Sequence, residues 1–195
     1  MSNEFEYYKV HRKNDNDVPL LNPETGCPKY LYQKKAIENP ELLTFKFGPP
    51  IPKKPKITDF HTSPYSVISS NIFNVLSVRN IYGVQLLACT IRGNNDKIYT
   101  DYWAVHAYQR IRCIDLANSD CIIDDVMISY VKKLALDKKT LKAIPLEKRL
   151  LFRLGEDSSY ELYHISIMEA IINVNPGGIR FTDIEKWDAK SPFKK

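Results

Sequence analysis

Residues 160–184 read YELYHISIMEAIINVNPGGIRFTDI, and this stretch contains a complete unit of secondary structure. Polar and apolar side chains alternate over 160–165, which is typical of a half-buried strand. Ser166 and Glu169 then fit a capping box, in which both side chains bind free backbone N–H groups of the first helical turn. The helix predicted over 167–173 buries one apolar stripe. This stripe consists of Ile167, Met168, Ile171 and Ile172.

The predicted helix ends at 175–178, because proline cannot continue a helix and glycine accepts a positive φ. Residues 179–184 alternate again as a closing strand. The same order occurs upstream, where Ser69 precedes a short apolar helix over 71–76 and Gly83 opens a strand. Two explanations stay open: an internal duplication of this unit, or the common reuse of capped helices between strands in α+β folds.

The rest of the chain is dominated by β-type patterns. Runs rich in β-branched and aromatic residues predict further strands at 84–91, 98–107, 108–114, 126–131 and 149–154. Short polar loops separate these runs, and loops of hairpin length favour antiparallel neighbours. We therefore predict an α+β fold, with a mostly antiparallel sheet and a few short capped helices.

The order of loops and regular segments predicts a single domain. Its three parts are an irregular N-terminal layer with a proline-rich connector over 1–56, a regular α+β core over 57–185, and a tail over 186–195. Within the first part, residues 5–10 read as a strand. The connector at 48–56 contains four prolines, which fix φ and remove N–H donors, so we expect an extended segment. A proline-rich segment can also dock on an aromatic groove of a partner.

Composition places the chain among globular proteins and excludes a spanning helix. Of its 195 residues, 44% are hydrophobic and 26% are charged, which argues against disorder as the main state. No apolar run reaches the length that crosses a bilayer, and the N-terminal residues lack the apolar segment of a secretory signal. We expect no membrane partner and a cytoplasmic location.

The cysteines agree with that location. None of the four, at positions 27, 89, 113 and 121, belongs to a CxxC pair, so free thiols in a reducing compartment are expected. An alternative is a zinc site made of Cys113, Cys121, His106 and His164. Structural zinc sites usually draw their ligands from closely spaced pairs, and these four residues are spread along the chain. We therefore predict no metal and no cofactor.

Catalytic motifs are missing from the sequence. It contains no G-x-S-x-G elbow, H-E-x-x-H helix, Walker loop or dinucleotide-binding glycine motif. Acidic residues at 120, 124 and 125 lie in a turn-like stretch, where aspartate usually bonds its own backbone. The remaining catalytic hypothesis is an uncharacterised enzyme that uses Asp101, His106 and Asp115. We predict that the protein is not an enzyme.

Lysines provide the candidate binding residues. The net charge is +5, and basic residues gather in two places. The candidates for partner binding are Lys53, Lys54, Lys132, Lys133, Lys138 and Lys139. Nucleic-acid binding is disfavoured, because acidic residues interrupt the lysine runs that a continuous basic stripe would need. These lysines could instead meet an acidic protein surface, or serve only solubility.

The order of short motifs resembles a family of bacterial polymorphic-toxin immunity proteins, the MXAN-type family, which is number eleven in the usual series. The sequences LFRL at 151–154, YHIS at 163–166 and GIRF at 178–181 are similar to its C-terminal strands and helix. Upstream, YWAV at 102–105 and RCID at 112–115 are similar to further family segments, although Arg112 replaces an acidic residue.

This resemblance implies a protein that acts by binding a partner and whose shared motif residues maintain the fold. The motif residues are Trp103, Asp115, Phe152, Arg153, Ser166, Gly178 and Phe181. The family has no catalytic residues to carry over, and its members bind and neutralise a cognate toxin. The implied partner is therefore a toxin protein, and another cytosolic interaction module is the alternative. We further expect Phe152, Phe181, Ile171, Ile172 and Trp103 to be largely buried.

Overall fold

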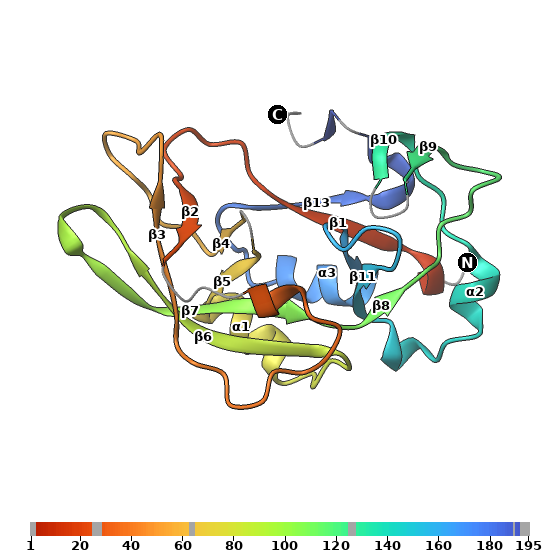
Figure 1. The fold of residues 1–195 in the computed structure, drawn as a ribbon, viewed down its shortest axis with the longest axis horizontal. Coiled ribbons are helices and arrows are strands. Elements are labelled where there is room, and N and C mark those ends of the chain that lie inside the picture. The colour runs from red at the N-terminus through yellow and green to blue at the C-terminus, as the bar shows by residue number, and fades with distance from the viewer. Residues whose placement is uncertain (1–2, 25–28, 63–64, 125–127, 189, 192–195) are drawn as a thin grey trace.

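The computed structural model describes residues 3–24, 29–62, 65–124, 128–188 and 190–191 as two β-sheets, a hairpin and three short α-helices in a single domain. Figure 1 shows the long hairpin of β6 and β7 extending to one side, with α2 and the β9–β10 hairpin at the other. The predicted α+β class is confirmed. Most strand pairs are antiparallel, and the parallel pairs are β3 with β6 and β8 with β11.

The first sheet contains five strands and is completed by the N-terminal strand. In sheet order these are β13 (Ile179–Asp183), β1 (Tyr7–Arg12), β12 (Glu161–His164), β11 (Leu151–Leu154) and β8 (Arg110–Ile111). Only two residues of the strand predicted at 108–114 pair in the sheet, followed by an isolated bridge between Ile114 and Leu136. The N-terminal strand lies between β12 and β13, so Tyr7–Arg12 form an interior strand of this sheet.

The second sheet contains six strands. In sheet order these are β2 (Leu20–Pro23), β3 (Leu43–Gly48), β6 (Val84–Arg92), β7 (Ile98–Ala107), β5 (Val67–Ser69) and β4 (Phe60–His61). The strands predicted at 84–91 and 98–107 are confirmed. Residues 1–56, expected as an irregular layer, supply β1, β2 and β3, while the proline-rich segment after β3 has no regular structure. A separate hairpin pairs β9 (Asp120–Ile123) with β10 (Ile128–Lys133).

Each sheet contains the unit of strand, helix, glycine and strand. In one, β5 leads into α1 (Ser70–Ser77) and Gly83 precedes β6; in the other, β12 leads into α3 (Ile165–Ile172) and Gly178 precedes β13. Both glycines have a positive φ, of 74° and 79°, which L-residues with a Cβ rarely adopt. The two strands of each unit flank a third strand, β7 or β1, in antiparallel pairs. Helices α1 and α3 contact each other between the units.

The predicted capping box is wrong. The N-cap of α3 is His164, whose Nδ1 accepts a hydrogen bond from the Ser166 N–H (3.2 Å), so Ser166 lies inside the first turn. Helix α1 has Ser69 at its N-cap, but the Ser69 hydroxyl donates to Asp59 Oδ1 (2.5 Å) and does not cap the helix. The third helix, α2 (Lys138–Lys142), is capped by Asp137, whose side chain accepts from the N–H groups of residues 139 and 140.

Three apolar clusters form the core. One lies between the five-stranded sheet and the β9–β10 hairpin, a second joins α1 and α3 to both sheets, and a third covers the other face of the six-stranded sheet. Burial confirms the expectation for Phe152 and Ile171, which are 0% and 1% exposed. Ile172 contradicts it, because 50% of this residue is exposed. Phe181 and Trp103 are only partly buried, and Trp103 stacks on Phe73 with ring centroids 4.1 Å apart.

Candidate functional site

A polar cleft lies where the end of the five-stranded sheet meets the six-stranded sheet. Its volume is about 400 Å³, and its walls come from β1, the start of β12, the loop before it, the segment before β5, and Tyr32. This cleft, called here the inter-sheet cleft, is lined by Lys9, Val10, His11, Arg12, Asn14, Tyr32, Thr62, Tyr65, Ser66, Arg153, Ser158, Ser159 and Glu161. Strands distant in sequence therefore place two arginines, a lysine and several hydroxyl groups around one space.

Arg153 and Glu161 form the charged floor of the inter-sheet cleft. They are cross-strand neighbours on β11 and β12, and they are 4% and 6% exposed. Arg153 Nη2 donates to Glu161 Oε2 (3.3 Å), and Tyr163 OH donates to Glu161 Oε1 (2.6 Å). Both carboxylate oxygens thus have a donor. Arg153 Nη1 also donates to the Leu31 carbonyl (3.2 Å), but the buried Arg153 Nε has no hydrogen-bond partner among the described residues.

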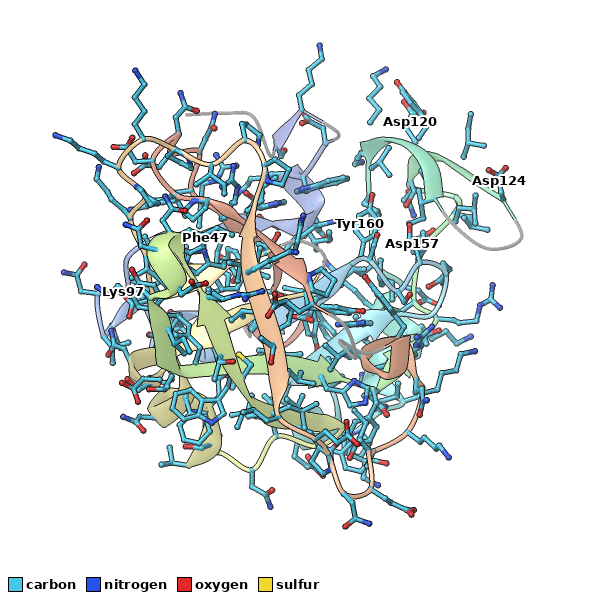
Figure 2. All side chains as sticks on the ribbon, turned by 60° about the vertical axis from the view of Figure 1, so that its left-hand side comes forward. Phe47, Lys97, Asp120, Asp124, Asp157 and Tyr160 are labelled. Carbon is cyan, nitrogen blue, oxygen red and sulfur yellow. The ribbon has the colours of Figure 1, made fainter. Side chains whose placement is uncertain are left out.

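Aromatic rings surround the Lys9 ammonium in one wall of the cleft. Its Nζ lies 3.2 Å from the centroid of the Tyr160 ring and 4.5 Å from that of Trp187. Burial among these groups lowers the pKa of Lys9 to about 7. The nearby Asp157 carboxylate acts in the opposite direction and raises this pKa. Figure 2 shows Asp157 and Tyr160 beneath the hairpin that carries Asp120 and Asp124. Near neutral pH, Lys9 therefore carries less positive charge on average than an exposed lysine does.

His11 is neutral in the same wall. Burial, with the positive charges of Lys9 and Arg180 nearby, lowers the pKa of His11 to about 4. Its Nε2 accepts a hydrogen bond from Trp187 Nε1 (3.1 Å), which requires an unprotonated nitrogen. The permanent positive charges of the cleft are therefore those of Arg12 and Arg153.

A segment over residues 29–37, called here the strap, borders the cleft and is held by side chains from both sheets. His106 places Nδ1 3.1 Å from the Leu31 carbonyl and Nε2 2.9 Å from the Lys35 carbonyl. Arg110 Nη2 donates to the Tyr32 carbonyl, and the Arg153 guanidinium lies over the Tyr32 ring. His106, proposed from sequence as a catalytic candidate, thus fastens the strap.

The other two residues of the enzyme hypothesis lie elsewhere. Asp101 is exposed on β7, whereas His106 is fully buried. Asp115 accepts hydrogen bonds from the backbone N–H groups of Ala117 and Asn118 (3.1 and 3.2 Å) in a turn. The fold does not gather these three side chains into one constellation.

The residues of the zinc alternative are also dispersed. Cys113 is buried in the core, where burial raises the pKa of its thiol, and Cys121 lies on β9. His106 binds the strap and His164 caps α3. Within the described parts of the chain, no group of three or more His, Cys, Asp or Glu residues is placed to hold a metal ion. Asp125 and Cys27 lie outside the described residues.

The lysines selected from sequence form two separate exposed groups. Lys132 and Lys133 lie on β10, and Lys138 and Lys139 lie on α2. Lys133, Lys138 and Lys139 line a shallow depression together with Asp115, Asp137 and Glu185. Two of them are in ion pairs, Lys132 with Asp120 (3.3 Å) and Lys138 with Glu185 (3.8 Å). Lys53 and Lys54 belong to the segment after β3, which Figure 1 places at the opposite end of the molecule from α2.

Sequence reasoning missed the inter-sheet cleft. It selected Arg153 only as part of a structural motif and did not select Lys9, His11 or Arg12. The available signal was the run KVHR at the end of the first strand, where three basic or titratable side chains follow an apolar strand pattern. This run lines a cleft only because β1 pairs with strands from the last third of the chain.

A family model described as the immunity protein family (Imm11) matches residues 6–186, which include all three helices and every strand. This is the family that the sequence motifs resemble. No curated protein gives a match. Among the described residues, no helix is long and apolar enough to cross a membrane.

Proposed function

This chain belongs to the Imm11 immunity protein family, and we propose that it binds and neutralises a cognate bacterial toxin by direct contact, without catalysis. The observation that carries the proposal is the family match over residues 6–186, which covers both sheets and the cleft between them. The positions of the catalytic candidates support the non-catalytic part, because His106 and Asp115 use their polar atoms on the protein's own backbone.

We infer that the partner is a protein, and neither nucleic acid nor membrane. Two separated lysine groups, partly neutralised by acidic neighbours, are a poor fit to a continuous phosphate backbone. A cytoplasmic location is also proposed. It is supported by the free thiols of Cys113 and Cys121, which suit a reducing compartment.

The direct test is co-expression with the protein encoded just upstream, as the candidate toxin. Growth of cells that express the toxin should be restored by this protein, and the two purified proteins should form a stoichiometric complex. Rescue without a complex would contradict neutralisation by binding, and failure of rescue with the protein folded and expressed would contradict the immunity function.

We propose that the exposed lysines accelerate the encounter with an acidic toxin surface. Charges outside a tightly packed contact act mainly on the association rate, because their fields act over about 10 Å at moderate salt. Replacing Lys132, Lys133, Lys138 and Lys139 with Glu should slow association several-fold at low salt and reduce its salt dependence, as measured by stopped-flow mixing.

The pair Lys53→Glu and Lys54→Glu tests the second lysine group separately. Circular dichroism should confirm that both charge-reversed proteins are folded. An unchanged association rate at low salt in both proteins would reject the lysines as steering residues.

A further inference from the structure

The inter-sheet cleft contains a buried cation whose hydrogen-bonding groups are not all paired within the described part of the chain. Arg153 is 4% exposed, yet its Nε lacks a hydrogen-bond partner among the described residues. Buried polar groups in native proteins are hydrogen-bonded in the great majority of cases, so each exception needs an explanation. Arg153 lines a space of about 400 Å³, so a ligand in that space would lie beside its guanidinium group.

The charges around the cleft favour an anion. Two guanidinium groups, of Arg12 and Arg153, face one carboxylate, and the Glu161 carboxylate already accepts hydrogen bonds from both Arg153 and Tyr163. Arg12 uses Nη1 on the Val18 carbonyl (2.8 Å), which fixes its position at the end of β1. Burial away from bulk water strengthens the attraction between a guanidinium and a carboxylate, and their geometry allows paired hydrogen bonds.

We propose that the inter-sheet cleft anchors an acidic side chain of the toxin, whose carboxylate binds Arg153 and Arg12. This anchor rests on the proposed immunity function and adds the site and chemistry of the contact. The volume is enough for one or two side chains and too small for a folded element. Hydroxyl groups of Thr62, Ser66, Ser158 and Ser159 line the same space and offer further donors.

A buried anchor and steering by surface charges affect different rate constants of binding. Interfaces depend on a few buried contacts for most of their binding energy. Losing one partner of a desolvated charged pair acts mainly on the dissociation rate, whereas distant surface charges act on the association rate. The cleft and the exposed lysines can therefore be separated by kinetics.

The test blocks the cleft from its exposed edge and leaves the buried arginine in place. Ser159 is an exposed lining residue, so Ser159→Trp should fill the entrance without disturbing the core. Ser77→Trp, at an exposed position on α1, is the matched control. Arg12→Glu reverses a lining charge. Its control is Arg79→Glu, because Arg79 lies on the surface away from the cleft and, like Arg12, donates from Nη1 to a backbone carbonyl, that of Val75.

Surface plasmon resonance with the immobilised toxin should show dissociation at least about tenfold faster for Ser159→Trp and Arg12→Glu, which corresponds to about 1.4 kcal/mol. Both controls should dissociate like the unmodified protein, and all four variants should keep its melting temperature. If the two cleft variants fold and dissociate at the unmodified rate, the anchor is wrong.

A second measurement distinguishes a toxin side chain from a free small anion. The melting temperature of the protein is measured in malonate, with chloride at equal ionic strength as the reference. Stabilisation that Ser159→Trp abolishes, together with unchanged toxin dissociation, would assign the cleft to a small anion and overturn the proposal. If the unmodified protein does not bind the toxin at all, the immunity function itself fails, whereas binding that is insensitive to the cleft variants removes only the anchor.

Discussion

His61 lies on β4 with 1% exposure, and its Nε2 accepts a hydrogen bond from the Thr58 N–H (3.2 Å). Burial lowers the pKa of His61 to about 4, from an ordinary value of 6.5. The unfolded chain therefore takes up a proton at a higher pH than the folded chain does. The contribution of neutral His61 to the free energy of unfolding is complete above pH 6.5, and it is lost as the pH falls through 4.

His61→Gln should reduce this acid sensitivity. The lowered pKa of His61 in the folded chain corresponds to roughly 3 kcal/mol of unfolding free energy at full titration. Urea unfolding at pH 7.5 and pH 4.5 should show a smaller loss of unfolding free energy in the variant than in the unmodified protein. Part of the loss should remain, because the pKa of His11 is also lowered to about 4. Equal losses in both proteins would contradict the assignment.

Two phenylalanines of the recognised motifs differ in burial, so their replacement by alanine should lower the unfolding free energy by different amounts. Phe152 is 0% exposed and its ring centroid lies 5.3 Å from that of Tyr7, whereas Phe181 is partly buried against Tyr163. Phe152→Ala should cost about 3–5 kcal/mol of unfolding free energy. Phe181→Ala should cost about 1–2 kcal/mol, since less apolar area is lost. Denaturant unfolding measures both, and toxin protection lost from Phe181→Ala without any loss of stability would instead place Phe181 in the interface.

At the scale of the element, the start of α3 depends on His164. Its ring accepts the Ser166 N–H, and the Ser166 hydroxyl lies 2.9 Å from the same Nδ1. His164→Ala should cost about 1 kcal/mol, which is typical for loss of an N-cap. Ser166→Ala should cost less, because the backbone donor keeps its acceptor. Thermal unfolding of both variants decides between this cap and the predicted capping box, in which Ser166 would be the costlier loss.

The apolar stripe of α3 shows that periodicity does not predict the burial of every residue on a helix face. Ile167 and Ile171 are each 1% exposed, but Ile172 is half exposed although it lies next to Ile171 in sequence. The pattern alone indicates a wide apolar face. How much of that face is covered depends on where α1 and the five-stranded sheet contact the helix.

At the scale of the whole molecule, the strap connects the two sheets through backbone carbonyls. His106 and Arg153 both bind the Leu31 carbonyl, one from the six-stranded sheet and one from the five-stranded sheet. His106→Leu should remove both contacts, at a cost of roughly 1 kcal/mol, because the Leu31 carbonyl keeps its hydrogen bond from Arg153 whereas the Lys35 carbonyl loses its contact with His106. Hydrogen exchange of amides in the strap should become faster.

Tyr102→Phe is the control for the strap. It removes a hydrogen bond from the same strand to a backbone carbonyl, that of Thr58 (2.9 Å), and should leave exchange in the strap unchanged. Equal exchange in the strap for His106→Leu and the unmodified protein would show that His106 does not hold it.

The sequence by itself determined the family, the α+β class, the long strands at 84–91 and 98–107, and the two units in which a glycine separates a short helix from a strand. These features are local, because side-chain period, helix stops and glycine positions act over a few neighbouring residues. The cap of α3, the exposure of Ile172 and the shortening of the strand at 108–114 required neighbours from other parts of the chain.

Only the tertiary structure decided the candidate site. The inter-sheet cleft combines β1 with β11, β12 and the strap, so its residues come from both ends of the sequence. Lys9 meets Tyr160 and Trp187, and Arg153 meets the Leu31 carbonyl, across more than a hundred residues. Such contacts depend on which strands pair, and pairing is fixed by the burial of whole faces rather than by any single short pattern.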